Sequence, residues 1–278
     1  MNHGYIPIAT SQSGSCLTMA NWQEIGINAL AFQLQSLLMK PGFSLLRSFA
    51  NLQSYCAWSK GLILNASLPL ANAEGVHKFR SLYDGTMLTI SQPELFALII
   101  KLEADIVILP EGFIGYLAEQ PISFPSSVKL FVPEKDFLTA KKMNDFGISL
   151  VYDSTKSFDD FYNQFKQYSC PTYLSGLFTL IQAKKLMEGG ASYLESNLPS
   201  NDALRGQIYD EDSSFNLLDS EMAHQHKLIS SNCTCPTCTQ KLTRAYLHHL
   251  YLHTPLLCHR FLIHHNAHYY KGRIETKA

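Results

Sequence analysis

The sequence predicts an α/β protein whose main domain is a TIM (β/α)8 barrel. Eight short apolar segments, many rich in β-branched or aromatic residues, recur before residue 200. The last five begin roughly 20 residues apart, which is the spacing of a strand followed by a short helix. Most are apolar throughout, as parallel strands buried on both faces are. A doubly wound open sheet would give the same pattern and is the alternative.

The elements follow in chain order. We expect strands at residues 5–10, 29–34, 61–67, 105–110, 128–133, 148–153, 172–176 and 191–196. Ser91 with Glu94 three residues later forms a capping-box pattern, which predicts a helix beginning near residue 92. Gly147 and Gly189 stand at the ends of two further helical patterns and are candidate C-caps.

One segment does not fit the strand–helix repeat. Asp84-Gly85 lies between two β-like runs in residues 73–91, and this dipeptide is a strong hairpin signal. We therefore expect an antiparallel hairpin inserted into the barrel. A polar stretch after residue 210 indicates a connector. The predicted domains are a pared-down barrel at 1–215 and a C-terminal metal-binding subdomain at 216–278 packed on the barrel.

Composition narrows the class of protein. The chain has 278 residues and is 46% hydrophobic, enough for a sizeable core. No run of 18 apolar residues and no basic-then-apolar leader is visible, so we expect no membrane span and a cytoplasmic location. From Cys233 onward there are six Lys or Arg against one acid. A basic C-terminal segment is compatible with a nucleic-acid backbone as partner.

Three of the seven cysteines form a cluster, Cys233, Cys235 and Cys238. In a reducing compartment, clustered cysteines favour metal binding over disulfides. Three thiolates need a fourth ligand, and a histidine returning from the C-terminal segment, His264 or His265, could supply it. A Cys₃His set fills a tetrahedral ion and leaves no open position, so such a site is structural and not catalytic.

Taken together, these residues resemble the tRNA-guanine transglycosylase (queuine tRNA-ribosyltransferase) family, which exchanges a guanine in tRNA for a deazaguanine base. The family ends in C-x-C-x-x-C, then RAYLHHL, then HN. Here those are the three cysteines, residues 244–250 and His265-Asn266. The resemblance implies a TIM barrel with an inserted zinc subdomain, structural Zn²⁺, and His265 as the fourth ligand.

The likeness extends over most of the chain, but the residues that the family uses for chemistry differ. Residues 40–58, 74–94 and 190–206 are similar to family segments. By that resemblance, Ala66 occupies the position of an aspartate used in base recognition and catalysis. Glu111 stands where a base-binding aspartate is expected, and Glu195 where the nucleophilic aspartate is expected. The simplest interpretation of Glu195 is a solvated residue at a strand end.

Three functions follow as hypotheses. The first is a divergent, non-catalytic member resembling the family's accessory subunit, which would dimerise with a catalytic homologue through the zinc subdomain and meet tRNA. The second is an active base-exchange enzyme that uses Glu195 as nucleophile. The third and most remote is an unrelated TIM-barrel hydrolase, which would need carboxylates and histidines at several strand ends.

Overall fold

The core of the molecule is an eight-stranded parallel barrel. The computed structural model describes residues 4–120, 124–141, 146–210 and 214–275. The barrel strands are β1 (Gly4–Ile6), β2 (Ala29–Gln33), β3 (Gly61–Asn65), β6 (Ile106–Ile108), β7 (Lys129–Pro133), β8 (Gly147–Tyr152), β9 (Thr172–Gly176) and β10 (Tyr193–Glu195). Each of the eight expected strands is confirmed, with bounds shifted by up to four residues.

The strands follow one another around the barrel in chain order. They pair in parallel from β2 through β3 and β6 to β10, and β10 pairs with β1. The ring is completed between its two ends, where Ile8 bridges Ala31. The amide of Ala9 donates to the carbonyl of Ala31 at 2.8 Å, and the amide of Ala31 donates to Pro7 at 3.0 Å. This closure decides for the TIM barrel and against the open sheet.

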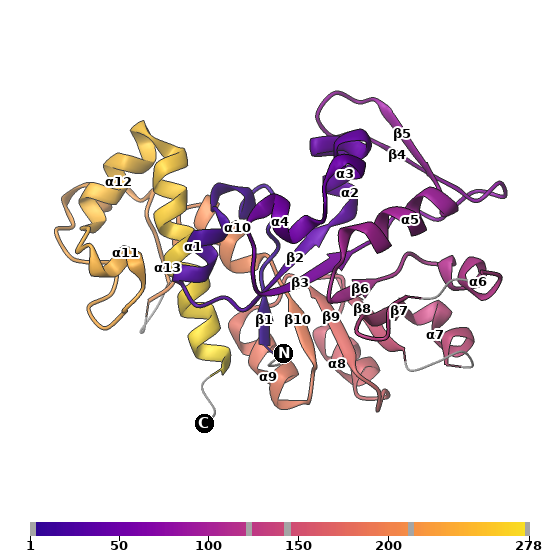
Figure 1. Cartoon of the computed structure of the whole chain (residues 1–278). Helices are drawn as coiled ribbons and strands as arrows, with labels where there is room; N and C mark the ends of the chain where they lie inside the picture. Colours follow the sequence, from indigo (N-terminus) through magenta and orange to yellow (C-terminus); the bar gives the residue numbers. More distant parts are fainter. Residues whose placement is uncertain (1–3, 121–123, 142–145, 211–213, 276–278) are drawn as a thin grey trace.

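Helices and short helical turns connect the strands on the outside (Figure 1). They are η1 (Gly14–Cys16), α1 (Met19–Glu24), α2 (Leu34–Leu37), η2 (Leu38–Gly42), α3 (Phe43–Ser48), α4 (Leu52–Cys56), α5 (Gln92–Leu102), α6 (Phe113–Ala118), α7 (Glu134–Ala140), α8 (Phe158–Phe165), α9 (Leu180–Glu188) and α10 (Leu198–Leu204). The predicted capping box is present at α5, where both Ser91 and its amide donate to the Glu94 carboxylate.

Side chains alternate between the barrel interior and the helix layer, because successive residues of a strand point to opposite faces. One set packs with the helices in the large outer core. The other set forms a separate cluster inside the barrel, made of Ile6, Ile8, Ala31, Ile63, Ile106, Ile108, Phe131, Tyr173 and Tyr193. The interior is therefore a packed core and not a channel.

The inserted hairpin is confirmed. β4 (Val76–Arg80) pairs antiparallel with β5 (Met87–Ser91), and the chain reverses through Asp84 and Gly85, whose φ is +73°. Glycine takes this positive φ without steric cost. In Figure 1 the hairpin projects at the upper right, away from the C-terminal helices at the left.

The C-terminal part is built around one long helix. After β11 (Gln207–Ile208) and β12 (Phe215–Asn216) come η3 (Ser220–His224), α11 (Pro236–Thr239), α12 (Arg244–His253) and α13 (Pro255–Glu275). α13 contacts α10, α9 and β1 of the barrel as well as α11 and α12. The division at residues 215 and 216 stays a prediction. In the described part of the chain, no helix has the length and apolarity needed to cross a membrane.

One helix end was predicted wrongly. α7 ends at Ala140, and Gly147 is not its cap but the first residue of β8. Residues 142–145 of that expected helix lie outside the described part. A Cβ at Gly147 would approach a ring carbon of Phe131 to 2.3 Å and the Pro171 carbonyl oxygen to 2.8 Å. Glycine is therefore required here by close packing, not by helix termination. Gly189, in contrast, is confirmed as the C-cap of α9.

Candidate functional site

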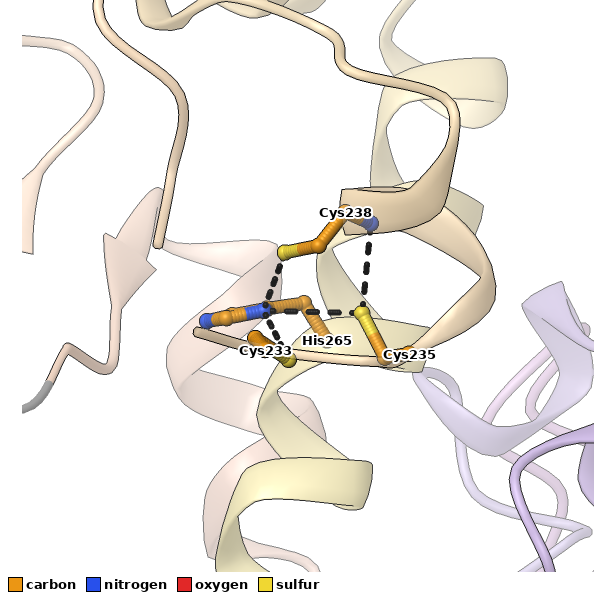
Figure 2. Close-up of side chains that lie close together, drawn as sticks. All are labelled: Cys233, Cys235, Cys238 and His265. Atoms are coloured by element: carbon orange, nitrogen blue, oxygen red, sulfur yellow. Dashed lines mark hydrogen bonds between the residues drawn. The ribbon is translucent and has the colours of Figure 1, made fainter. Parts of the chain in front are cut away.

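The structure brings the three clustered cysteines and His265 together. The Sγ atoms of Cys233, Cys235 and Cys238 lie 3.6, 3.6 and 3.3 Å from His265 Nδ1. All four donor atoms lie within 4.8 Å of one another, and Figure 2 shows the sulfurs arranged around the ring nitrogen. Tetrahedral zinc bonds of about 2.3 Å to sulfur and 2.0 Å to nitrogen place such atoms roughly 3.6 Å apart. The four residues therefore fit one tetrahedral ion.

Local structure positions each donor. Cys235 is the N-cap of α11, and its Sγ accepts from the amide of Cys238 at 3.4 Å. The hydroxyl of Thr237 donates to the carbonyl of Phe261 at 2.7 Å, which fixes this turn against α13. His265 comes from the buried face of α13. His264, the alternative ligand, is also buried but does not join the group.

The imidazole of His265 is oriented by its second nitrogen. Nε2 lies 2.6 Å from the carbonyl oxygen of Tyr209 and donates to it, so that Nδ1, which faces the three sulfurs, is the nitrogen that would bind an ion. Burial disfavours the imidazolium, but Cys233, Cys235 and the Tyr209 carbonyl outweigh it and raise the pKa of His265 to about 10. The group is thus electrostatically suited to hold positive charge.

Asn266 ties this helix to the barrel. Its Nδ2 donates to the carbonyls of Pro199 at 3.1 Å and Gln207 at 2.8 Å, and its Oδ1 accepts from the amide of Tyr209 at 3.1 Å. Pro199 belongs to α10, which begins directly after β10. His265 and Asn266 therefore link the Cys₃His group to the segment that follows the carboxyl end of the last barrel strand.

Arg244 has an internal role. Its guanidinium donates to Asp210 at 2.9 Å and to the carbonyls of Leu228 and Ile229 at 3.0 Å, and it covers the ring of Phe215. Lys271 is likewise paired, with Glu275 at 3.1 Å. Two of the six C-terminal basic residues thus satisfy internal partners, which weakens the argument for a nucleic-acid backbone from charge alone.

Glu195 ends β10 inside the barrel, and its expected solvation is wrong. Only 3% of the residue is exposed. Tyr173 Oη donates to its carboxylate at 2.6 Å, and Asn65 Nδ2 donates at 3.3 and 3.4 Å. Burial raises the pKa of Glu195, and the bonds from Tyr173 and Asn65 oppose that rise only in part. The carboxyl group is therefore held without a cationic partner among its hydrogen-bonding neighbours.

Glu111 and Ala66 do not extend this group. Glu111 follows β6 and forms a surface ion pair with Lys135 at 2.8 Å. Ala66 is fully buried, its amide bonded to the Ile108 carbonyl, and its methyl group offers no proton. Sequence reasoning missed Tyr173 and Asn65. The alternation of side chains along a strand could have indicated Tyr173. It lies two residues before Ser175, which pairs with Glu195, so both side chains point into the barrel.

Comparison with known proteins agrees with this architecture. A family model described as queuine tRNA-ribosyltransferase matches residues 147–276. The queuine tRNA-ribosyltransferase of Sorangium cellulosum is 32% identical over 108 residues, 39% of this chain and only 27% of that protein. Those of Lawsonia intracellularis and Oleidesulfovibrio alaskensis are each 22% identical over 96% of this chain and cover 84% and 82% of the relatives.

The matched region contains β8 to β10, Glu195, the cysteine cluster and the His-Asn pair. It thus includes both the end of the barrel and the helix that Asn266 ties to it. The two longer alignments add the rest of the barrel at lower identity. The family model over the C-terminal half and the two longer alignments together support membership of the queuine tRNA-ribosyltransferase family.

Proposed function

We propose that this chain acts in queuine modification of tRNA as a non-catalytic accessory subunit. The observation that carries the proposal is the environment of Glu195, which by the sequence resemblance takes the position of the family's nucleophile. Its carboxyl group is almost fully buried and is bonded by Tyr173 and Asn65.

Base exchange, as the resemblance describes it, needs a carboxylate that attacks the ribose C1′ while guanine leaves. A nucleophile must reach the substrate in a near-attack geometry, and a misplacement near 1 Å can cost about a hundredfold in rate. Glu195 is one methylene longer than the expected aspartate, and its oxygens face Tyr173 and Asn65. Ala66 supplies no second carboxylate for proton transfer. These features support the proposal that the chain keeps the barrel fold but does not catalyse base exchange.

The Cys₃His group supports a retained structural role. We propose that it holds Zn²⁺, because three thiolates and an imidazole in tetrahedral spacing match that ion. The four protein ligands would leave no open position for a substrate or water. The ion would fix the turn around α11 against α13, and so preserve the outer surface of the subdomain.

That surface is the proposed contact with a catalytic homologue. Three large apolar side chains around the α12–α13 corner are exposed: Leu252, Leu256 and Leu257. Contiguous exposed apolar side chains mark interaction sites on soluble proteins. We expect a catalytic homologue on this surface, because a chain without the reacting groups needs a partner that has them. The cytoplasmic location expected from the sequence stays a prediction.

Two measurements test the proposal. The first is incorporation of labelled guanine into tRNA by the chain alone, where we expect none above background. Incorporation that disappears in Glu195→Gln would establish the alternative, an active enzyme with Glu195 as nucleophile. Incorporation that persists in Glu195→Gln would exclude both assignments.

The second measurement is gel filtration of the chain mixed with a full-length catalytic homologue, with tRNA binding followed at low salt. We expect a complex that Leu256→Glu disrupts. Ile181→Glu is the matched control, because Ile181 is equally exposed but lies on α9 of the barrel. Absence of any complex, or equal loss in both variants, would contradict the proposed contact.

A further inference from the structure

Two histidines face each other on the exposed side of α12. His249 and His253 are one helical turn apart, and both side chains are exposed. Their ring centroids lie 4.3 Å apart with an interplanar angle of 40°. Residues at i and i+4 of a helix are neighbours on its surface, so this proximity is built into the helix and does not depend on a long-range contact.

The ring nitrogens of His249 and His253 are not engaged in other polar contacts within the described residues. Across the described residues, no hydrogen bond or ion pair engages a nitrogen of either ring. The neighbouring His248 is different, because it is buried and its Nδ1 bonds the carbonyl of Leu217 at 2.7 Å. The only charged side chain of α12 is Arg244, which is turned inward and paired with Asp210. Nothing on the helix itself therefore repels a cation at the histidine pair.

We propose that His249 and His253 chelate a divalent transition-metal ion at a second site, separate from the Cys₃His group. Imidazole nitrogens suit Ni²⁺, Cu²⁺ and Zn²⁺. Two histidines at i and i+4 on one helix face are also the pair that binds zinc in H-E-x-x-H helices. Neither histidine belongs to the Cys₃His group, whose members come from α13 and the turn around α11.

The two sites differ in kind. The Cys₃His group encloses its ion with four protein ligands, whereas the histidine pair supplies two and leaves the remaining positions to water or to a donor from another molecule. The second site is therefore open and exchangeable, and its ion is lost without unfolding the chain. The inference stands on the pair alone and holds whether or not the chain pairs with a homologue.

The test is a calorimetric titration of the full chain, free of any histidine tag and loaded at the Cys₃His group, with Ni²⁺ in a non-thiol reductant. We expect one additional Ni²⁺ per chain. His249→Ala and His253→Ala should each weaken its binding at least tenfold, because one imidazole is a monodentate ligand. His226→Ala, another exposed histidine, should leave it unchanged.

Circular dichroism of each variant checks that α12 remains folded, which the exposed positions predict. Wild-type binding retained in the double variant His249→Ala/His253→Ala, or no additional Ni²⁺ bound by the wild-type chain, would overturn the assignment. A loss in His226→Ala equal to that in His253→Ala would do the same.

Discussion

The hydrogen bonds of Asn266 give a prediction whose size follows from the structure. Replacing Asn266 by alanine removes two bonds to the carbonyls of Pro199 and Gln207 and one from the amide of Tyr209. The residue is fully buried, so the three backbone groups would lose their partners out of contact with water. An unsatisfied buried group costs about 1–3 kcal/mol. We therefore expect the free energy of unfolding to fall by about 3 kcal/mol or more.

Urea unfolding followed by tryptophan fluorescence measures this loss, with the change in midpoint converted through the slope of the transition. Asn163→Ala is the control, because Asn163 is exposed on α8 and should change stability by no more than about 0.5 kcal/mol. The metal content should remain that of the wild type, since Asn266 is not a ligand. A loss below about 1 kcal/mol would refute the claim that Asn266 joins the C-terminal helix to the barrel.

Three further predictions concern the cluster, the barrel carboxyl group and one glycine. His265→Ala should lower the bound metal well below one ion per chain and reduce the melting temperature, whereas His264→Ala should keep the metal. Elemental analysis of the two variants measures the difference. Equal metal content in both would contradict the assignment of His265 as the ligand. Because burial raises the pKa of Glu195 in the folded state, the folded chain keeps its proton at pH values where the unfolded chain has lost it. The stability of the wild type relative to Glu195→Gln should therefore fall as pH rises above the ordinary glutamate range and through the raised folded pKa, and identical pH slopes in urea unfolding would show that this carboxyl is not perturbed. Gly147→Ala should lower the stability of the folded chain by about 1–3 kcal/mol through overpacking against Phe131. Gly115→Ala is the control and should have no such effect, because there is open space at its Cβ. Equal effects of the two substitutions on thermal unfolding would contradict the packing argument.

Local signals predicted the elements well, because each depends on neighbours in the sequence. The strands were visible as apolar runs, the start of α5 as a capping box, and the hairpin as Asp84-Gly85. The prediction for Gly147 was wrong because glycine occurs both at helix ends and where packing leaves no room for a side chain. A glycine after a helical pattern usually caps it, but here the ring of Phe131 on the neighbouring strand excludes any side chain. That ring is distant in sequence, so no local pattern could reveal it.

By itself the sequence determined the α/β class with its eight strands and the three sulfur donors, because strand periodicity and the Cys-x-Cys-x-x-Cys spacing are local properties of the chain. The resemblance already implied His265 as the fourth ligand, but only the tertiary structure gave the physical reason for that choice and decided what surrounds Glu195. Adjacent residues of a helix point about 100° apart, so the docking of α13 on α10 selects His265 over His264. Likewise, closure of the barrel places Asn65 and Tyr173, from two other strands, around the carboxyl group of Glu195. A strand end that could have been solvated is thereby sealed.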